Sequence, residues 1–126
     1  MTAAYWCTIL SIIITYAFTG IAKFAQGKYD NSSPREQLNN ASGWSKRAYW
    51  AHLNSLEVMP QFIGAVIIAH LTEIPQINID YASFAFIILR IAYGVFYILD
   101  WAWYRSYCWL AGMFIIAYLI TGSIFV

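Results

Sequence analysis

Four long apolar stretches alternate with shorter polar segments along the chain. Residues 3–22 contain no charged side chain, and residues 48–71 are polar in their first half and apolar afterwards. Two further apolar stretches cover residues 81–103 and 107–126. Each is about as long as the roughly 20 residues that an α-helix needs to cross a bilayer. The pattern predicts an all-α integral membrane protein whose four transmembrane helices form an up-down bundle.

The segments between these stretches are polar and rich in residues that favour turns. Residues 23–45 form the only long loop, in which Pro34 suits the first position of a short interfacial helix. The second connection, residues 72–80, contains a proline, and the third is a tight turn within residues 100–107. Because short connections join antiparallel neighbours, all 126 residues are expected to form a single membrane domain.

The composition agrees with a membrane environment. Hydrophobic residues make up 61% of the chain and charged residues 10%, against about 45–50% and about 25% in soluble domains. A soluble domain of this size could not bury so much apolar surface. The lipid bilayer is therefore the expected main partner. A net charge of +1 and the lack of any recognisable nucleic-acid motif argue against binding to nucleic acid.

The basic side chains are concentrated at one end of the predicted bundle. The chain has seven lysines and arginines. Five of them lie in or beside the first loop, namely Lys23, Lys28, Arg35, Lys46 and Arg47. Arg105 lies in the third turn, whereas the second loop holds only Glu73 and Asp80. The positive-inside rule therefore predicts that loop 23–45 and the third turn are cytoplasmic and that both termini lie outside.

Polar residues follow one face of each of the two central helices. On the second helix they are Arg47, Trp50, Asn54, Glu57 and Gln61, and on the third they are Arg90, Tyr93, Tyr97, Asp100 and Tyr104. Steps of three and four residues place each set on one helical face. Glu57 and Arg90 have similar expected depths in the bilayer, which predicts an ion pair between them. Such a pair has either a binding role or only the role of fixing helix register.

The same region suggests a ligand cavity in the cytoplasmic half of the bundle. Asn54, Tyr93, Tyr97 and Arg105 offer amide, phenol and guanidinium donors, which suit an anionic ligand with carboxylates. The tyrosines could equally serve helix packing alone. His52 points to a different helical face, where it is either a hydrogen-bonded interface residue or a ligand contact. No histidine or cysteine lies at metal-ligand spacing, so no metal site is expected.

The second helix resembles the signature of the MAPEG superfamily, the membrane-associated proteins in eicosanoid and glutathione metabolism that include microsomal glutathione transferases. The match is carried by Ala51, His52, Leu53, Asn54, Glu57 and Pro60. In the third helix Arg90, Tyr93 and Tyr97 have the family's spacing, and Arg105 follows them. The resemblance covers essentially the whole chain. The loop run Asp30 to Arg35 is similar to that of bacterial members, which implies the bacterial inner (cell) membrane.

The resemblance implies a homotrimer that binds glutathione, as a co-substrate, between subunits on the cytoplasmic side. Carried over by position, the binding residues are Asn54, Glu57, Arg90, Tyr93 and Tyr97, with Arg47, His52 and Lys23 as further contacts. Arg105 becomes the catalytic residue that stabilises the glutathione thiolate. The implied function is a glutathione-dependent membrane transferase or peroxidase that conjugates or reduces lipophilic small-molecule electrophiles.

One position departs from the family pattern. The glutathione-using enzymes usually carry arginine immediately before the Ala-His pair, and this chain has Trp50 there. An arginine fork binds a carboxylate bidentately and an indole cannot. The alternative is therefore a non-catalytic MAPEG-fold protein that binds another amphiphile or serves a structural role. A small proton-coupled exporter is disfavoured because such exporters need an acidic residue in the first helix, and residues 3–22 contain none.

Overall fold

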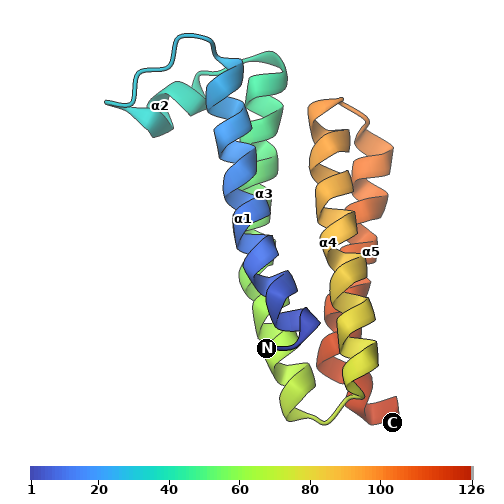
Figure 1. Ribbon diagram of the computed structural model, residues 1–126. Helices are drawn as coiled ribbons and strands as arrows, with labels where there is room; N and C mark the ends of the chain where they lie inside the picture. The colour runs from blue at the N-terminus through green and yellow to red at the C-terminus, as the bar shows by residue number, and fades with distance from the viewer. Residues whose placement is uncertain (126) are drawn as a thin grey trace.

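Five α-helices and one 3-10 helix make up the structure, a computed structural model that describes residues 1–125 (Figure 1). The elements are α1 (Ala3–Ala25), α2 (Pro34–Asn39), α3 (Gly43–Leu71), α4 (Gln76–Ile98), α5 (Ala102–Thr121) and the 3-10 helix η1 (Gly122–Phe125). The predicted all-α class and the short helix that starts at Pro34 are confirmed. Val126, the last residue of the predicted fourth span, lies outside the described residues.

The bounds of α4 and α5 differ from those predicted. α4 begins at Gln76 rather than at residue 81, directly after Pro75, whose ring suits the start of a helix. It ends at Ile98, and Asp100 then adopts a positive φ of 63°, which a right-handed helix does not contain. α5 consequently begins at Ala102, and Arg105, expected in the turn between the helices, lies in the first turn of α5.

The four long helices are arranged as two adjacent pairs. Figure 1 shows α1 beside α3 and α4 beside α5, with successive long helices running in opposite directions. α3 and α4 are central, because each contacts all three other long helices. Both termini lie at one end, and α2 lies at the opposite end beside α1 and α3. The long first loop and the α4–α5 turn therefore share one end of the molecule.

Three helical segments are long and apolar enough to cross a membrane. They are α1, α4 and the segment Ala102–Phe125, which joins α5 and η1. α3 has 29 residues, a length of about 43 Å at about 1.5 Å per residue, but the polar side chains of its first half lower its hydropathy. Large apolar side chains, such as Ile13, Ile88 and Phe114, are more than half exposed on the outer surface, as lipid-facing residues would be.

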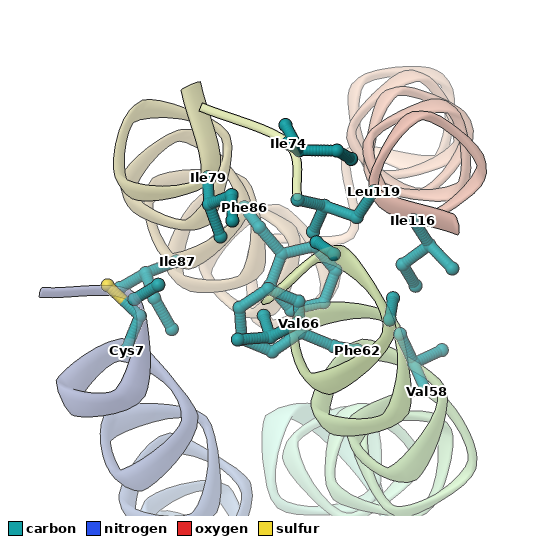
Figure 2. Close-up of a cluster of buried hydrophobic side chains, with 13 residues drawn as sticks. Cys7, Val58, Phe62, Val66, Ile74, Ile79, Phe86, Ile87, Ile116 and Leu119 are labelled. Atoms are coloured by element: carbon teal, nitrogen blue, oxygen red, sulfur yellow. The ribbon is translucent and has the colours of Figure 1, made fainter. Parts of the chain in front are cut away.

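An apolar core fills the half of the molecule that holds the termini (Figure 2). The buried rings of Phe62 from α3 and Phe86 from α4 stack with centroids 3.9 Å apart and planes 11° from parallel. Other buried members are Cys7, Val58, Val66, Ile74, Ile79, Ile87, Ile116 and Leu119. Because all four long helices contribute, this core fixes how each helix is rotated about its own axis.

In the other half of the molecule, α1 approaches α4 closely at Gly94. A Cβ atom at Gly94 would lie 1.9 Å from Cζ of Phe18, so the ring of Phe18 occupies the space that any other side chain would need. Phe18 is buried at this contact. The absence of a side chain at Gly94 therefore sets the spacing between the two helices.

At the end that holds the termini, Asp80 joins α4 to α1. The sequence pattern assigned Asp80 to a loop, but it lies within the first half of α4. Its Oδ1 accepts hydrogen bonds from the backbone N–H of Ala4 at 2.8 Å and from Nε2 of Gln76 at 2.9 Å. A carboxylate at a helix N-terminus is favourable because the helix dipole is positive there. Asp80 thus caps α1 from a neighbouring helix.

Hydrogen bonds made by the side chains of Asp30 and Gln37 hold the first loop together. The carboxylate of Asp30 accepts hydrogen bonds from the backbone N–H of Ser32 at 3.0 Å and from its hydroxyl at 2.6 Å. Both hydrogen bonds favour the ionised form, so they hold the pKa of Asp30 below its ordinary value. The amide of Gln37 bonds to both backbone polar groups of Asp30. These contacts connect the loop to α2.

Candidate functional site

Arg90 is a charged side chain buried among the helices, only 5% exposed. Its Nη2 donates hydrogen bonds to Oδ1 of Asn54 at 3.1 Å and to the hydroxyl oxygen of Ser55 at 2.8 Å. Its guanidinium carbon lies 4.2 Å from the ring centre of Tyr93, its neighbour one turn further along α4. Two neutral acceptors on α3 and one aromatic face therefore surround the guanidinium.

The predicted Glu57–Arg90 ion pair is wrong. Among residues 1–125 the bonds of Arg90 go to Asn54 and Ser55, and Glu57 is exposed on the outer surface of α3. The reason is helical geometry. At about 100° per residue, Glu57 lies about 110° around α3 from the direction midway between Asn54 and Ser55. Matching depth in the bilayer was therefore insufficient for contact.

Tyr93, Tyr97 and Arg105 come together at the junction of α4 and α5. The two tyrosine rings meet edge to face with centroids 5.6 Å apart. The guanidinium carbon of Arg105 lies 4.2 Å from the ring centre of Tyr97. A pocket of about 210 Å³ opens here, lined by Tyr93, Tyr97, Arg105, Ser106 and Trp109. The structure thus brings together three of the residues predicted for the site, with the guanidinium of Arg105 against the ring of Tyr97.

Trp50 stands beside this pocket on the face of α3 that borders α4. Its ring centroid lies 6.4 Å from that of Tyr97, and the side chain is 44% exposed. The ammonium group of Lys46 lies 5.7 Å from the Trp50 ring centre. Trp50 therefore extends the aromatic wall of the site at the position where the family pattern expects an arginine.

Lys23 and His52 lie on the other side of the helix bundle. His52 is buried, and its Nδ1 donates a hydrogen bond of 2.7 Å to the backbone oxygen of Thr15. Both residues line a groove of about 450 Å³ between α1, α2 and α3. Arg35 of α2 lines the same groove. At about 100° per residue, His52 and Asn54 project from α3 about 160° apart. The fold of the chain therefore keeps His52 and Asn54 apart.

Comparison with protein families agrees with this geometry. The family model described as the MAPEG family matches residues 3–125, nearly the whole chain. This chain belongs to the MAPEG family. No curated protein and no solved structure matches it. The family, together with the three apolar spans, makes the chain an integral membrane protein of the group concerned with eicosanoid and glutathione metabolism.

The remaining residue predicted for the site has a structural contact in this MAPEG protein. Nε of Arg47 donates a hydrogen bond of 2.9 Å to the backbone oxygen of Ile98, the last residue of α4. The carbonyl groups at a helix C-terminus lack partners within the helix, and a cation there also suits the helix dipole. Arg47 therefore caps α4 and holds it against α3.

Several residues of the candidate site were missed by the sequence reasoning. Ser55 bonds to Arg90, Ser106 and Trp109 line the α4–α5 pocket, and Arg35 lines the groove with Lys23. Trp109 could have been found from its spacing of four from Arg105, once both are known to lie on one helix. Ser55 and Arg35 carry no comparable signal in the sequence. Within residues 1–125, no three metal-ligating side chains form a cluster.

Proposed function

We propose that this MAPEG protein is a glutathione-dependent transferase or peroxidase that acts on lipophilic electrophiles at the cytoplasmic side of the bilayer. The observation that carries the proposal is the α4–α5 pocket, in which the guanidinium of Arg105 lies over Tyr97. Guanidinium and phenol groups are hydrogen-bond donors suited to a thiolate. The tyrosine and tryptophan rings that line the pocket suit an apolar substrate arriving from the bilayer.

Arg105 is the proposed catalytic residue. A cysteine thiol has a pKa of about 8.5, so only a small fraction of free glutathione is thiolate at neutral pH. A guanidinium beside the sulfur lowers the pKa of the thiol and increases that fraction. In conjugation, the thiolate sulfur forms a bond to an electrophilic carbon, and the leaving group departs with the bonding electron pair.

The peroxidase reaction uses the same thiolate. Its sulfur attacks the terminal oxygen of a lipid hydroperoxide, the O–O bond breaks, and the alkoxide takes up a proton to become the alcohol. The resulting sulfenic acid condenses with a second glutathione to give the disulfide and water. Two glutathione thiols are thereby oxidised while one hydroperoxide is reduced.

The proposed topology has four membrane crossings, with α3 as the fourth. α3 is long enough to span, and its polar residues Asn54 and Glu57 lie on the side of the proposed site rather than scattered around the helix. The basic first loop and Arg105 lie at one end of the molecule, which supports a cytoplasmic location for that end. Both termini then lie outside, and the resemblance of the loop to bacterial members supports the bacterial inner membrane.

We infer that the complete site forms between subunits of a homotrimer. The α4–α5 pocket has about 210 Å³, whereas pockets that hold drug-sized ligands have about 300–1,000 Å³, so one subunit offers room for only part of a tripeptide. Lys23 and His52 line a groove on the other side of the subunit. A neighbouring copy could present that groove to Asn54, Glu57 and Arg105.

Trp50 supports the second candidate, a non-catalytic MAPEG-fold protein. The indole of Trp50 is 44% exposed, with its ring centroid 6.4 Å from that of Tyr97, and it offers one N–H donor, where an arginine would offer a bidentate fork. An aromatic wall of this kind would suit a different amphiphile at least as well as a glutathione carboxylate. The two candidates are separated by whether the protein binds a thiol as thiolate.

The test is a glutathione titration of the protein in nanodiscs, followed by thiolate absorbance and thermal shift. Wild type is compared with Arg105→Ala, and with Lys28→Ala as the matched control, because Lys28 is a cation at the same end but lies in the first loop. The transferase proposal expects saturable stabilisation of wild type and of the control. It also expects the thiolate signal to be lost in Arg105→Ala.

One outcome would reject the transferase proposal, and a second would reject the catalytic role of Arg105. One is the absence of any thermal shift at millimolar glutathione, which would favour the non-catalytic candidate. The other is a thiolate signal that persists in Arg105→Ala, which would assign thiolate stabilisation to another residue.

A further inference from the structure

We propose that an interior cavity beside Arg90 binds a single small anion, which in the cell is a chloride ion. The cavity lies between α1, α3 and α4, and it shares no lining residue with the α4–α5 pocket. The anion is the counterion of a guanidinium whose hydrogen bonds, among residues 1–125, all go to neutral groups. The site is independent of glutathione binding and lies outside the proposed function.

The cavity is small, buried and lined largely by polar side chains. Its volume is about 10 Å³, which is room for one guest of about the size of a water molecule, and a chloride ion is only slightly larger. Ser11, Thr15, Ser55 and Arg90 line it together with three apolar residues. None of these four polar residues is more than 5% exposed, so a guest in the cavity is shielded from bulk water.

The guanidinium of Arg90 has hydrogen-bond donors to spare. It carries five N–H groups and no acceptor, and the two on Nη2 bond to Asn54 and Ser55. The other three, on Nε and Nη1, have no acceptor within residues 1–125. In the same residues, the one polar side-chain atom that lacks both a partner and accessible surface is the hydroxyl oxygen of Ser83. The spare donors of Arg90 therefore reach accessible space, and the cavity that Arg90 lines provides it.

Ser55 adds a fourth donor to this set. Its hydroxyl oxygen accepts a hydrogen bond of 2.8 Å from Arg90, while its own proton has no acceptor within residues 1–125. The hydroxyls of Ser11 and Thr15 instead donate to backbone oxygens of α1, each at 2.7 Å. The donors available to a guest thus come from Arg90 and Ser55, on the sides of the cavity formed by α4 and α3.

These donors suit an anion better than a water molecule. A charge buried without a counterion is costly within a membrane protein, and water would accept hydrogen bonds from Arg90 without cancelling its charge. A halide ion accepts several hydrogen bonds at once and cancels the charge. Carboxylates and phosphates are too large for a cavity of about 10 Å³. A monoatomic anion is therefore the guest that fits both the charge and the volume.

Bromide tests the site directly, because it replaces chloride and its anomalous X-ray scattering identifies it in a crystal. Wild-type crystals grown in sodium bromide are expected to show an anomalous peak in the cavity, within hydrogen-bonding reach of Arg90. Arg90→Met should lose this peak. Arg35→Met is the matched control, because it makes the same change at an exposed arginine of α2 outside the cavity, and it should keep the peak.

Two crystallographic outcomes would overturn the proposal. Bromide peaks confined to the outer surface of the protein would show an adventitious ion only. Density for water in the cavity, without a bromide peak there, would identify the guest as water.

Thermal unfolding in nanodiscs provides the solution test, with sodium chloride compared to sodium gluconate at equal ionic strength. Gluconate is too large for the cavity, and a ligand that binds only the folded state raises the melting temperature with its concentration. Wild type and Arg35→Met are expected to gain several degrees in chloride, with saturation. Arg90→Met should melt at the same temperature in both salts. Identical melting of wild type in the two salts would refute chloride binding.

Ser55→Ala keeps the test decisive if Arg90→Met does not fold. This variant retains the guanidinium but lacks the hydroxyl donor, so it should need roughly tenfold more chloride for half of the stabilisation. An unchanged chloride requirement would contradict a site built by Arg90 and Ser55. Both experiments omit glutathione, so a failure of the chloride site and a failure of the proposed function are detected separately.

Discussion

Arg90 illustrates how this protein keeps a charge within the bundle without a carboxylate partner. An unpaired charge at the bilayer centre costs several kcal/mol, and here an amide, a hydroxyl and a tyrosine ring surround the guanidinium. Neutral partners of this kind leave the positive charge uncancelled. They also leave Glu57 without an ion-pair partner among residues 1–125.

Glu57→Gln is therefore expected to change binding more than stability. Glu57 is exposed, so neutralising it should alter the unfolding free energy of the subunit by less than about 0.5 kcal/mol. If Glu57 accepts a hydrogen bond from the ammonium group of glutathione, affinity should fall roughly tenfold or more. Thermal unfolding and glutathione titration in nanodiscs measure the two effects, with Glu73→Gln in the distant second turn as control. A lower melting temperature with unchanged affinity would reveal a structural partner instead.

At the scale of the elements, the contact between α1 and α4 determines how closely these two helices pack in the polar half of the bundle. Phe18 fits against the bare backbone of Gly94, while the stacked rings of Phe62 and Phe86 set the separation of α3 and α4 in the apolar half. These two contacts act on different helix pairs and at different depths. Together they fix the orientation of α4, on which Arg90, Tyr93 and Tyr97 all lie.

Gly94→Ala is expected to destabilise the fold by overpacking. The new methyl group would lie 1.9 Å from Phe18, and extra atoms in a packed core typically cost about 1–3 kcal/mol. Gly112→Ala is the matched control, because its Cβ would meet Phe86 at 3.6 Å, an ordinary contact distance. Thermal unfolding in nanodiscs compares the two. Adding Phe18→Leu to Gly94→Ala should restore part of the loss, and no difference between the two alanine variants would refute the packing role.

For the whole molecule, the main consequence of the fold is that the predicted binding residues occupy two sides of the chain. Tyr93, Tyr97 and Arg105 line the α4–α5 pocket, whereas Lys23 and His52 line the groove between α1, α2 and α3. In a ring of identical subunits, one side of each copy meets the opposite side of the next. A trimer could therefore unite residues that a single chain keeps apart.

Mixed trimers test whether the site lies between subunits. Co-expression of Arg105→Ala chains with Lys23→Ala/His52→Ala chains should recover glutathione binding that neither variant has alone. In a trimer containing both variants, one junction in three would combine two intact sides, so recovery of roughly a third of the sites is expected. Binding stoichiometry on tandem-purified mixed trimers measures this. Homotrimers of each variant are the controls, and no recovery would assign the site to a single subunit.

Much of the fold could be predicted from the sequence because the bilayer restricts which backbone conformations a spanning segment can adopt. Backbone polar groups cannot remain unpaired in lipid, so long apolar runs must become helices. The resemblance of residues 47–60 to the MAPEG pattern was likewise local, and the match over residues 3–125 confirmed it. The predicted bounds of the helices were less accurate. Asp100 has a positive φ, so the turn between α4 and α5 comes earlier than predicted and Arg105 lies inside α5.

The sequence by itself thus determined the helical class, the membrane environment and the family of this protein. Only the tertiary structure decided that Arg90 turns towards Asn54 and Ser55, that Glu57 faces outward, and that His52 lies across the helix bundle from the α4–α5 pocket. Helical spacing states which residues share a face but not where that face points. The rotation of each helix about its axis comes from packing between helices, such as Phe62 on Phe86 and Phe18 on Gly94, and such contacts between distant segments have no signature in local sequence.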